Sequence, residues 1–505
     1  MGELEELLRL LEGKVIVSAE ISDDDLKGVD SFRLASEISL RLESVQGIRL
    51  LSKELLENIL ASMNAEKKPK SFEDIVKSED FVPKAKGMRI KYAYIKSKIE
   101  FVNSSPYDFI THFNNRFEKL KKITLAGRHA STTNIENLGD YLSGREVSVV
   151  GMVYEKKTTK NGHVLVTLED QTGSINVLFA KPEMRAGFTS GFRAEPSSLY
   201  SSATRIARDD VILVNGKLSK GLLIANSFSW PDVPVRVRKQ SESDFAIVMI
   251  SDVHVGSRLF LEKQFSNMLR WLNGAIDYKK ELASKVKFAV FCGDLVDGIG
   301  VYPGQEKELV ISDIYAQYSL FFEFLKSIPD HIEIFVLPGN HDAVRRADPQ
   351  PELDRELARY NTGNVHLVTN PSSLRLEDIS MLAYHGESLD SMIRAVPGIG
   401  YARPEEAMLE TLKRRHLSSI YGVNPIVPSK DDAMIIEEVP DILLMGHIHK
   451  NGALDYHGTL LVNSGTWQAR TSFQVKQGHM PSPAILPVYE AKTRSLSLLD
   501  FNKIA

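Results

Sequence analysis

The sequence predicts a multidomain protein, in which a small N-terminal helical module, a β-barrel and a C-terminal α/β domain follow one another. Leucines recur at helical spacing near the N-terminus, apolar residues alternate between residues 145 and 230, and strand-length apolar runs recur after residue 244. A length of 505 residues suits about three domains. We therefore divide the chain into a helical module, a basic linker with short helices, a barrel and an α/β domain, at residues 1–64, 65–140, 141–236 and 244–505.

The N-terminal module is predicted from Leu4, Leu7, Leu8 and Leu11, which share one helical face. We expect it to have a structural or partner-binding role. Residues 65–98 are polar and basic with little apolar periodicity, which is typical of a tether. Such a linker can touch DNA phosphates, although a solvated spacer is the favoured interpretation.

The central region carries the period-two pattern of a β-meander. Val147, Val149 and Val153 alternate with other residues, and two predicted turns separate the following strands, at residues 158–162 and 170–173. The pattern resembles an OB-fold, a five-stranded barrel often used on oligonucleotides. Tyr154 is almost the only aromatic residue on its exposed strands, so protein interaction is supported at least as well as DNA binding.

Five polar segments in the C-terminal domain each follow an apolar run of strand length. Such runs are typical of strands that are buried on both faces. Because functional groups in α/β sheets gather beyond the carboxyl ends of strands, we expect the five segments to converge. They are Asp252-Val253-His254, Gly293-Asp294-Leu295-Val296-Asp297, Gly339-Asn340-His341-Asp342, His385-Gly386 and Gly446-His447-Ile448-His449.

These segments combine carboxylate, amide and imidazole groups, the mixture that a pair of divalent cations needs to hydrolyse a phosphate ester. A single Asp-x-His or Gly-Asp is more often a capped turn than a ligand pair. All five segments in this order, each at a strand end, favour a two-metal phosphoesterase. The glycines before Asp294, Asn340 and His447 allow the backbone to turn sharply beside a metal ion.

Charge and composition restrict the interpretation further. There are 62 Lys and Arg against 66 Asp and Glu, a net charge of -4, so any DNA contact must be local or shared with a partner. The single cysteine, Cys292, lies on a predicted core strand and excludes an internal disulfide. The N-terminus lacks a basic signal region and no apolar run approaches a membrane span. We therefore expect a soluble cytoplasmic protein without a membrane partner.

The order of an OB-fold and a calcineurin-like phosphoesterase resembles the B-subunits of replicative DNA polymerases. The eukaryotic members of that group have lost metal ligands, whereas none is missing here. Flanking segments closely resemble the small subunits of archaeal family D DNA polymerases, from about Phe113 to the C-terminus. The resemblance implies a two-sheet sandwich flanked by helices. Glu387 departs from it, because many relatives carry a basic residue there. The flanking segments are residues 298–305, 346–351, 413–417, 440–442 and 463–468.

The resemblance also implies roles for the candidate residues. Asp294 would bridge the two ions, which agrees with the ability of two carboxylate oxygens to span ions roughly 3.5–4 Å apart. His341 is our candidate to protonate the departing sugar oxygen, Asp342 to orient that imidazole, and Asp297 to support the ligands. The mixed ligands suit manganese, with magnesium, zinc and iron as alternatives. One ion would be held by Asp252, His254 and His449, and the other by Asn340, His385 and His447.

The activity implied by the family is a 3′–5′ exonuclease that removes misinserted nucleotides. It would act on primer–template DNA and single-stranded 3′ ends, within a heterodimer whose large subunit carries synthesis. A contact with the sliding clamp is expected only through the whole complex. Residues 318–322 faintly resemble a clamp-binding peptide, but their spacing favours core packing. The alternatives are a stand-alone metallophosphoesterase acting on nucleotides or other phosphodiesters, and a catalytically silent polymerase scaffold. The flanking segments argue against the first, and the complete ligand set argues against the second.

Overall fold

The structure is a computed structural model, and it divides the chain into two units, residues 1–74 and 75–505. In the second unit it describes residues 81–89, 91–96, 105–127, 131–139, 142–182, 196–358 and 363–504. In the first unit it describes short pieces only, at residues 15–17, 21–22, 26, 49–51, 53 and 56–57.

The described part of the N-terminal unit contains a pair of parallel strands, β1 (Val15–Val17) and β2 (Arg49–Leu51). The strands were not predicted, because three residues are too few to set a period-two pattern apart from a helical one. The leucines on which the helical prediction rested lie outside the described residues.

Residues 146–229 contain a closed five-stranded barrel, as the alternating pattern predicts. Its inward-facing side chains, such as Val149, Val166, Val177 and Val214, are fully buried and form one core. The short helix α6 (Pro196–Thr204) packs against this core through Ala203 and Leu199. In barrel order the strands are β4 (Glu146–Thr158), β5 (Val164–Asp170), β6 (Gly173–Phe179), β8 (Leu222–Ser229) and β7 (Val211–Ser219).

The C-terminal domain is built on two six-stranded sheets within the described residues. The first has a parallel half, in which three of the predicted apolar runs lie side by side, and an antiparallel edge. Its strands, in spatial order, are β12 (Val365–Leu367), β11 (Glu333–Leu337), β10 (Val286–Cys292), β9 (Ala246–Ile250), β18 (Ile485–Glu490) and β19 (Ser495–Asp500).

The second sheet holds the remaining two predicted runs, as the parallel neighbours β14 and β15. Its edge strand β3 falls in the segment that we predicted to be a linker, and it pairs antiparallel with β13. Lys91 and Lys96 stand at the ends of this short strand, so its alternation of apolar and polar residues is not apparent in the sequence. In the structure, Tyr92 and Tyr94 pack edge-on against the Phe335 ring. In spatial order the strands are β16 (Asn451–Tyr456), β17 (Thr459–Ser464), β15 (Ile442–Met445), β14 (Ile379–Ala383), β13 (Ser372–Leu376) and β3 (Tyr92–Lys96).

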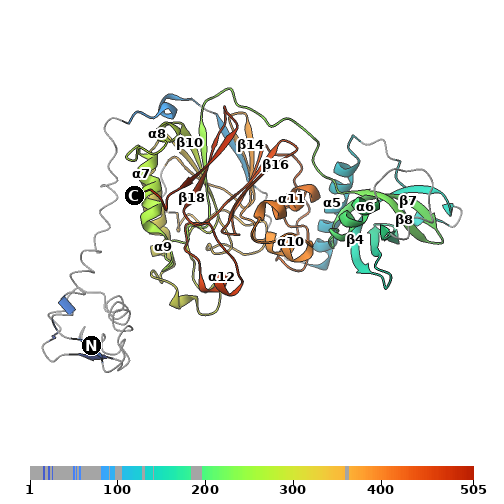
Figure 1. Cartoon of the computed structure of the whole chain (residues 1–505), viewed down its shortest axis with the longest axis horizontal. Coiled ribbons are helices and arrows are strands. Elements are labelled where there is room, and N and C mark those ends of the chain that lie inside the picture. Colours follow the sequence, from blue (N-terminus) through green and yellow to red (C-terminus); the bar gives the residue numbers. More distant parts are fainter. Residues whose placement is uncertain are drawn as a thin grey trace. The chain divides into compact units, whose positions relative to one another are not determined.

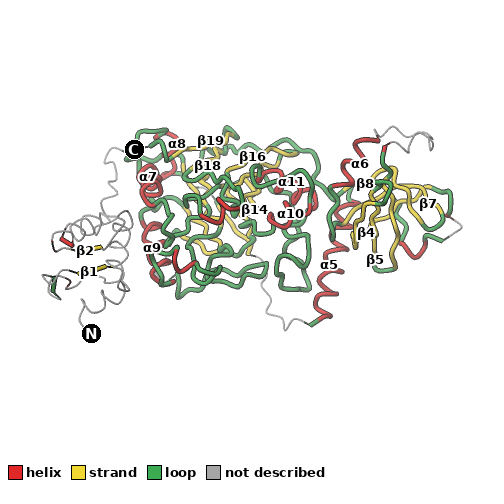
Figure 2. The backbone as a smooth tube through the Cα atoms, turned by 60° about the horizontal axis from the view of Figure 1, so that its bottom comes forward, coloured by secondary structure: helices red, strands yellow, loops and turns green. Residues whose placement is uncertain are grey.

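The two sheets pack face to face with helices on both outer faces, as Figures 1 and 2 show. Alternate residues of β9, β10, β14 and β15 meet between the sheets in one core, and the intervening residues of β14 and β15 pack against helices. On the other face, Phe291 of β10 packs edge-on against Phe321 of a helix. This arrangement explains why the runs are apolar throughout. One outer face is covered by α7 (Glu262–Leu272), α8 (Lys280–Ser284) and α9 (Ile314–Lys326), and the other by α10 (Leu389–Ala395) and α11 (Pro404–Arg414).

The barrel is attached to the two-sheet domain by buried charges. Arg414, the last residue of α11, donates to Asp210 of the barrel at 2.7 Å and to Glu410 at 2.6 Å. A long helix, α5 (Pro106–Leu125), packs on the barrel through Phe117 and Leu120. Its Arg116 donates to the buried Asp432 carboxylate at 2.6 Å. This helix lies within residues 65–140, for which we predicted a basic linker with short helices.

Short elements complete the described structure. The clamp-like residues 318–322 lie in α9, where Tyr318, Phe321 and Phe322 are buried, so this segment packs in the core as predicted. The short elements themselves are the 3-10 turns η2 (Lys84–Gly87), η3 (Ile135–Asn137) and η6 (Gln305–Lys307), and the helix α12 (Ser472–Lys476).

Candidate metal centre

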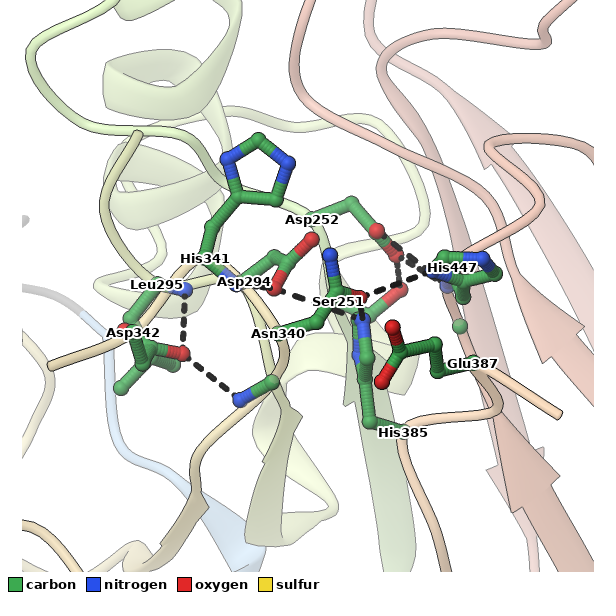
Figure 3. A network of polar contacts seen from close by, with 12 residues as sticks. Ser251, Asp252, Asp294, Leu295, Asn340, His341, Asp342, His385, Glu387 and His447 are labelled. Atoms are coloured by element: carbon green, nitrogen blue, oxygen red, sulfur yellow. Dashed lines mark hydrogen bonds and ion pairs between the residues drawn. The ribbon is translucent and has the colours of Figure 1, made fainter. Parts of the chain in front are cut away.

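The five polar segments meet at one end of the sandwich. Three of them follow β9, β10 and β11 of the first sheet, and two follow β14 and β15 of the second. The centre therefore lies where the carboxyl ends of both sheets come together, and Figure 3 shows the side chains converging there. The position agrees with the general tendency of α/β proteins to place functional groups at strand ends.

Several of the predicted ligands have a left-handed backbone, a conformation that non-glycine residues rarely adopt. The φ angles are 52° for Asp252, 54° for His254, 52° for Asp294, 65° for His447 and 58° for His449. Such residues cost about 1–3 kcal/mol each and persist where the surrounding structure requires them. Their concentration at one strand-end cluster indicates a functional site.

The glycines next to the ligands are required by close packing. A Cβ atom on Gly446 would lie 2.5 Å from Ser251 Oγ and 2.6 Å from Asp252 Oδ2. A Cβ atom on Gly339 would collide with the Asp294 carboxylate. The glycines therefore allow backbone and carboxylates to approach one another, besides the sharp turns that the sequence predicts.

The first predicted ligand set comes together as a buried group of Asp252, His254 and His449. The Nε2 atoms of the two histidines are 3.1 Å apart, and His449 Nε2 lies 3.3 Å from Asp252 Oδ1. All three offer ligand atoms within 4.8 Å of one another.

The second predicted set is equally close. The amide oxygen of Asn340 lies 3.0 Å from His385 Nε2 and 2.9 Å from His447 Nδ1. Figure 3 shows these three side chains pointing toward one another. His385 and His447 also form a candidate metal-binding group with Asp294.

Asp294 lies between the two sets. Its Oδ1 is 3.4 Å from His385 Nε2 in the second set, and its Oδ2 is 3.8 Å from His254 Nε2 in the first. Each carboxylate oxygen thus faces one set, which is the geometry that a bridging ligand needs.

The atoms that converge in the centre are suited to bind cations and are not suited to hydrogen-bond one another. The Nδ1 atom of His385 lies 2.9 Å from the carbonyl oxygen of Cys292, so it carries a proton in the neutral ring and Nε2 is left as a lone pair. That lone pair faces the oxygens of Asn340 and Asp294, which are acceptors too. Three converging acceptors repel one another unless positive charge lies between them.

The surroundings of the His385 imidazole show the same demand for positive charge. Burial alone would lower its pKa, but Asp294 and Asp252 outweigh burial and raise the pKa to about 10. A divalent cation satisfies this demand as a proton does, and the ligand types suit such an ion.

Residues behind the ligands hold the imidazoles in place. Asp297 Oδ1 lies 3.1 Å from His254 Nδ1, as we expected of a supporting residue. Asp390 Oδ2 lies 3.6 Å from His447 Nε2, and Gln474 Nε2 lies 2.9 Å from His449 Nδ1. The sequence analysis missed Asp390 and Gln474, because neither belongs to a strand-end motif. A carboxylate four residues after His385-Gly386 is the one signal for Asp390.

His341 and Asp342 differ in their surroundings. The Nδ1 atom of His341 lies 2.8 Å from the carbonyl oxygen of Asp297, so the group that orients this ring is Asp297 rather than the predicted Asp342. Asp342 accepts hydrogen bonds from the backbone of Gly339 and Leu295 and from Tyr318 Oη, at 2.8, 3.2 and 2.9 Å. It therefore ties two ligand loops to α9, a role that its sequence position does not reveal.

Glu387 also lies beside the centre, as Figure 3 shows. Its carboxylate is 3.7 Å from the guanidinium group of Arg346. A basic group is therefore present near this loop, although it comes from the segment after His341 and not from position 387.

Comparison with known proteins first defines the class. Residues 247–452 match the family of DNA polymerase alpha/epsilon B-subunits, and residues 147–226 match the OB-fold nucleic acid binding domain. The predicted OB-fold is confirmed, and the two-sheet domain is similar to the B-subunits of DNA polymerases.

Its relatives then define the family. The DNA polymerase II small subunit of Archaeoglobus fulgidus is 44% identical over 385 residues, covering 76% of this chain and 75% of that protein. That of Thermoplasma acidophilum is 34% identical over 503 residues, covering 98% and 97%. That of Pyrococcus abyssi is 40% identical over 403 residues, covering 77% and 62%. The chain belongs to the family of archaeal DNA polymerase II small subunits, the small subunits of family D polymerases, as its flanking segments predicted.

Membership of this family implies a large catalytic subunit as partner, within a DNA polymerase complex that acts in replication. Among the helices in the described parts of the chain, none combines the length and apolarity needed to cross a membrane.

Proposed function

We propose that this subunit is the 3′–5′ exonuclease of its polymerase, and that its two-sheet domain is a calcineurin-like metallophosphoesterase. The observation that carries the proposal is the position of Asp294, with one oxygen toward His385 and the other toward His254. A single structural ion needs one set of ligands, whereas two sets joined by a carboxylate are typical of hydrolytic centres with two metals.

The ligands proposed for the first ion are Asp252, His254 and His449, and those for the second are Asn340, His385 and His447. Manganese suits this mixture of nitrogen and oxygen ligands best, with magnesium, zinc and iron as alternatives. Two bound cations would neutralise the phosphate and supply hydroxide near neutral pH. Asp297, Asp390 and Gln474 hold the imidazole ligands in fixed orientations and so keep the two sets in register.

His341 is the proposed proton donor. Its Nδ1 is held by the Asp297 carbonyl, which leaves Nε2 to exchange a proton with the substrate. Burial lowers the pKa of His341 and outweighs the nearby Asp294 carboxylate, so its imidazolium form is a ready acid. The negative phosphate favours that form while the substrate is bound, and the proton then passes to the departing sugar oxygen.

The proposed substrate is the 3′ end of DNA that the large subunit has extended, so that hydrolysis removes misinserted nucleotides. The OB-fold supports a role next to DNA or to the large subunit, and the buried Arg414–Asp210 pair holds it firmly on the phosphoesterase domain. A scaffolding role is thus compatible with hydrolysis. A purely silent scaffold is not favoured, because it has no need of two complete ligand sets.

Replacement of the bridge tests the proposal in the purified heterodimer. Asp294→Asn should abolish hydrolysis of a 5′-labelled single-stranded oligonucleotide in manganese, while polymerase assembly on gel filtration is unchanged. Asp277→Asn is the matched control, because its side chain is 97% exposed in an ion pair away from the ligand sets. Full nuclease activity of Asp294→Asn would refute the two-metal centre.

A further inference from the structure

Two segments beside the first ligand set expose large apolar side chains. On residues 470–482, Phe473 is 68%, Val475 54% and Met480 60% exposed. On residues 298–310, Tyr302 is 37% and Val310 68% exposed. Exposed apolar groups of this size are unfavourable in water and, where they cluster, mark a surface that binds something.

The loop that carries Tyr302 is attached to the ligand His254. The side chain of Gln305 is fully buried and donates to the Asp297 carbonyl oxygen at 2.7 Å and to its carboxylate at 3.2 Å. The same carboxylate holds His254 at 3.1 Å. The Tyr302 ring lies 6.3 Å from that of His341, so this loop forms one wall of the centre.

The segment that carries Phe473 is attached to the other histidine of the same ligand set. Gln474, the next residue in α12, contacts His449 Nδ1 at 2.9 Å and is itself buried. A capping box between Thr471 and Gln474 fixes the start of the helix. The neighbours of Gln474 in the helix, Phe473 and Val475, therefore stand at a fixed position beside the metal ligands.

Glu308 joins the two segments. It accepts hydrogen bonds from Tyr302 Oη at 2.9 Å and from Ser472 Oγ at 3.2 Å. The two segments are thus joined to each other by Glu308, and each is attached to one imidazole of the first predicted set, through Asp297 to His254 and through Gln474 to His449.

We propose that Tyr302, Phe473, Val475 and Met480 form a platform on which the unpaired nucleobases at the 3′ end of the substrate stack. The inference rests on the proposed exonuclease function and names the feature that selects its substrate. Every base can stack on an aromatic group, so this kind of binding does not depend on the nucleotide sequence. A base that is still paired and stacked in the duplex must first leave it before it can stack on these side chains. The platform therefore favours frayed and mismatched ends over matched ones.

The test compares Phe473→Ala with Phe473→Trp in the heterodimer. One measurement is hydrolysis in manganese of an oligonucleotide with an unpaired 3′ end, and of the same oligonucleotide with two abasic residues at that end. The other is binding of the same oligonucleotides, measured by fluorescence anisotropy with calcium in place of manganese so that they are not hydrolysed. Tyr107→Ala on α5 is the matched control, because Tyr107 is 78% exposed but belongs to neither segment.

We expect Phe473→Ala to weaken binding and to raise KM for the unpaired end by about fivefold or more, while kcat changes by less than about twofold. Phe473→Trp should restore wild-type values because it can stack. With the abasic end, wild-type protein and Phe473→Ala should behave alike, because no base is left to stack. Tyr107→Ala should match the wild type throughout.

Equal binding of the unpaired end by wild-type protein and Phe473→Ala would overturn the platform. Dissociation of the heterodimer by Phe473→Ala would also overturn it, and would assign the surface to the large subunit. If the wild-type complex cleaves no DNA, the proposed function fails on its own, because the anisotropy measurement reports stacking without any cleavage.

Discussion

The imidazole Nδ1 of His341 lies 2.8 Å from the backbone carbonyl oxygen of Asp297, and this contact fixes the orientation of the ring. A carbonyl oxygen accepts only, so Nδ1 carries a proton and the ring is held in one tautomer. The same residue, Asp297, uses its carboxylate on the ligand His254. The orientation of the proposed acid and that of a metal ligand are therefore set by one residue.

His341→Ala should retain both metal ions and lose hydrolysis by about a hundredfold to ten-thousandfold, the usual contribution of a general acid. His447→Ala should lose the ion of the second set, because its Nδ1 lies 2.9 Å from the Asn340 oxygen. Metal counting on both purified variants, beside single-turnover hydrolysis, checks the distinction. Equal metal loss in the two variants would show that His341 is a ligand.

Asp297→Ala should weaken metal binding at the first set by about tenfold to a hundredfold, because His254 loses the carboxylate that orients it. Calorimetric titration of the metal-free protein with manganese measures the change in affinity. Asp277→Ala serves as the control, since that side chain is 97% exposed. An affinity equal to that of the wild type would mean that the ring is held by packing alone.

Arg414→Met should destabilise the protein by about 3–5 kcal/mol, because the buried Asp210 carboxylate loses the guanidinium group that neutralises it, and Glu410 is left with Arg205 alone at close range. Arg403→Met should change stability by less than about 0.5 kcal/mol, because Arg403 is 66% exposed in its pairs with Glu405 and Glu406. Urea unfolding with separate probes for the barrel and the two-sheet domain measures both. A mild effect of Arg414→Met would show that water or rearrangement solvates the two carboxylates.

The pH dependence of stability should contain a contribution from His416. Burial and the nearby Arg116 lower its pKa to about 4, although Asp432 acts in the opposite direction, and the backbone amide of Ser418 donates to Nδ1 of the neutral ring. Between pH 6.5 and 4 the unfolded chain binds a proton that the folded protein does not. Stability therefore falls as the pH drops through this window, by about 3 kcal/mol in full.

His416→Asn removes this titration, so its stability should fall less steeply than that of the wild type between pH 6.5 and 4. The comparison cancels the contributions of the titratable groups that do not interact with His416. Urea unfolding at five pH values in this window gives both slopes. Parallel slopes would show that the folded protein protonates His416 at its ordinary pKa.

The sequence by itself determined which residues form the candidate centre. Its ligand residues follow strand-length apolar runs, and buried strands produce that local pattern whatever lies beside them. The same holds for the OB-fold, whose alternation at residues 147–179 follows from one face packing inward. Family membership was also visible in the flanking segments, because those residues are contiguous in the chain.

Tertiary structure decided which groups support the centre. Asp390 and Gln474 reach the predicted ligands His447 and His449 from helices that carry no recognisable motif. Asp342, next to His341 in sequence, turns instead toward Gly339 and Tyr318. The strand β3 is too short and too polar at its ends to be recognised before it pairs with β13. Local pattern reports burial and residue type, whereas the partner of a single polar group depends on contacts between segments far apart in the chain.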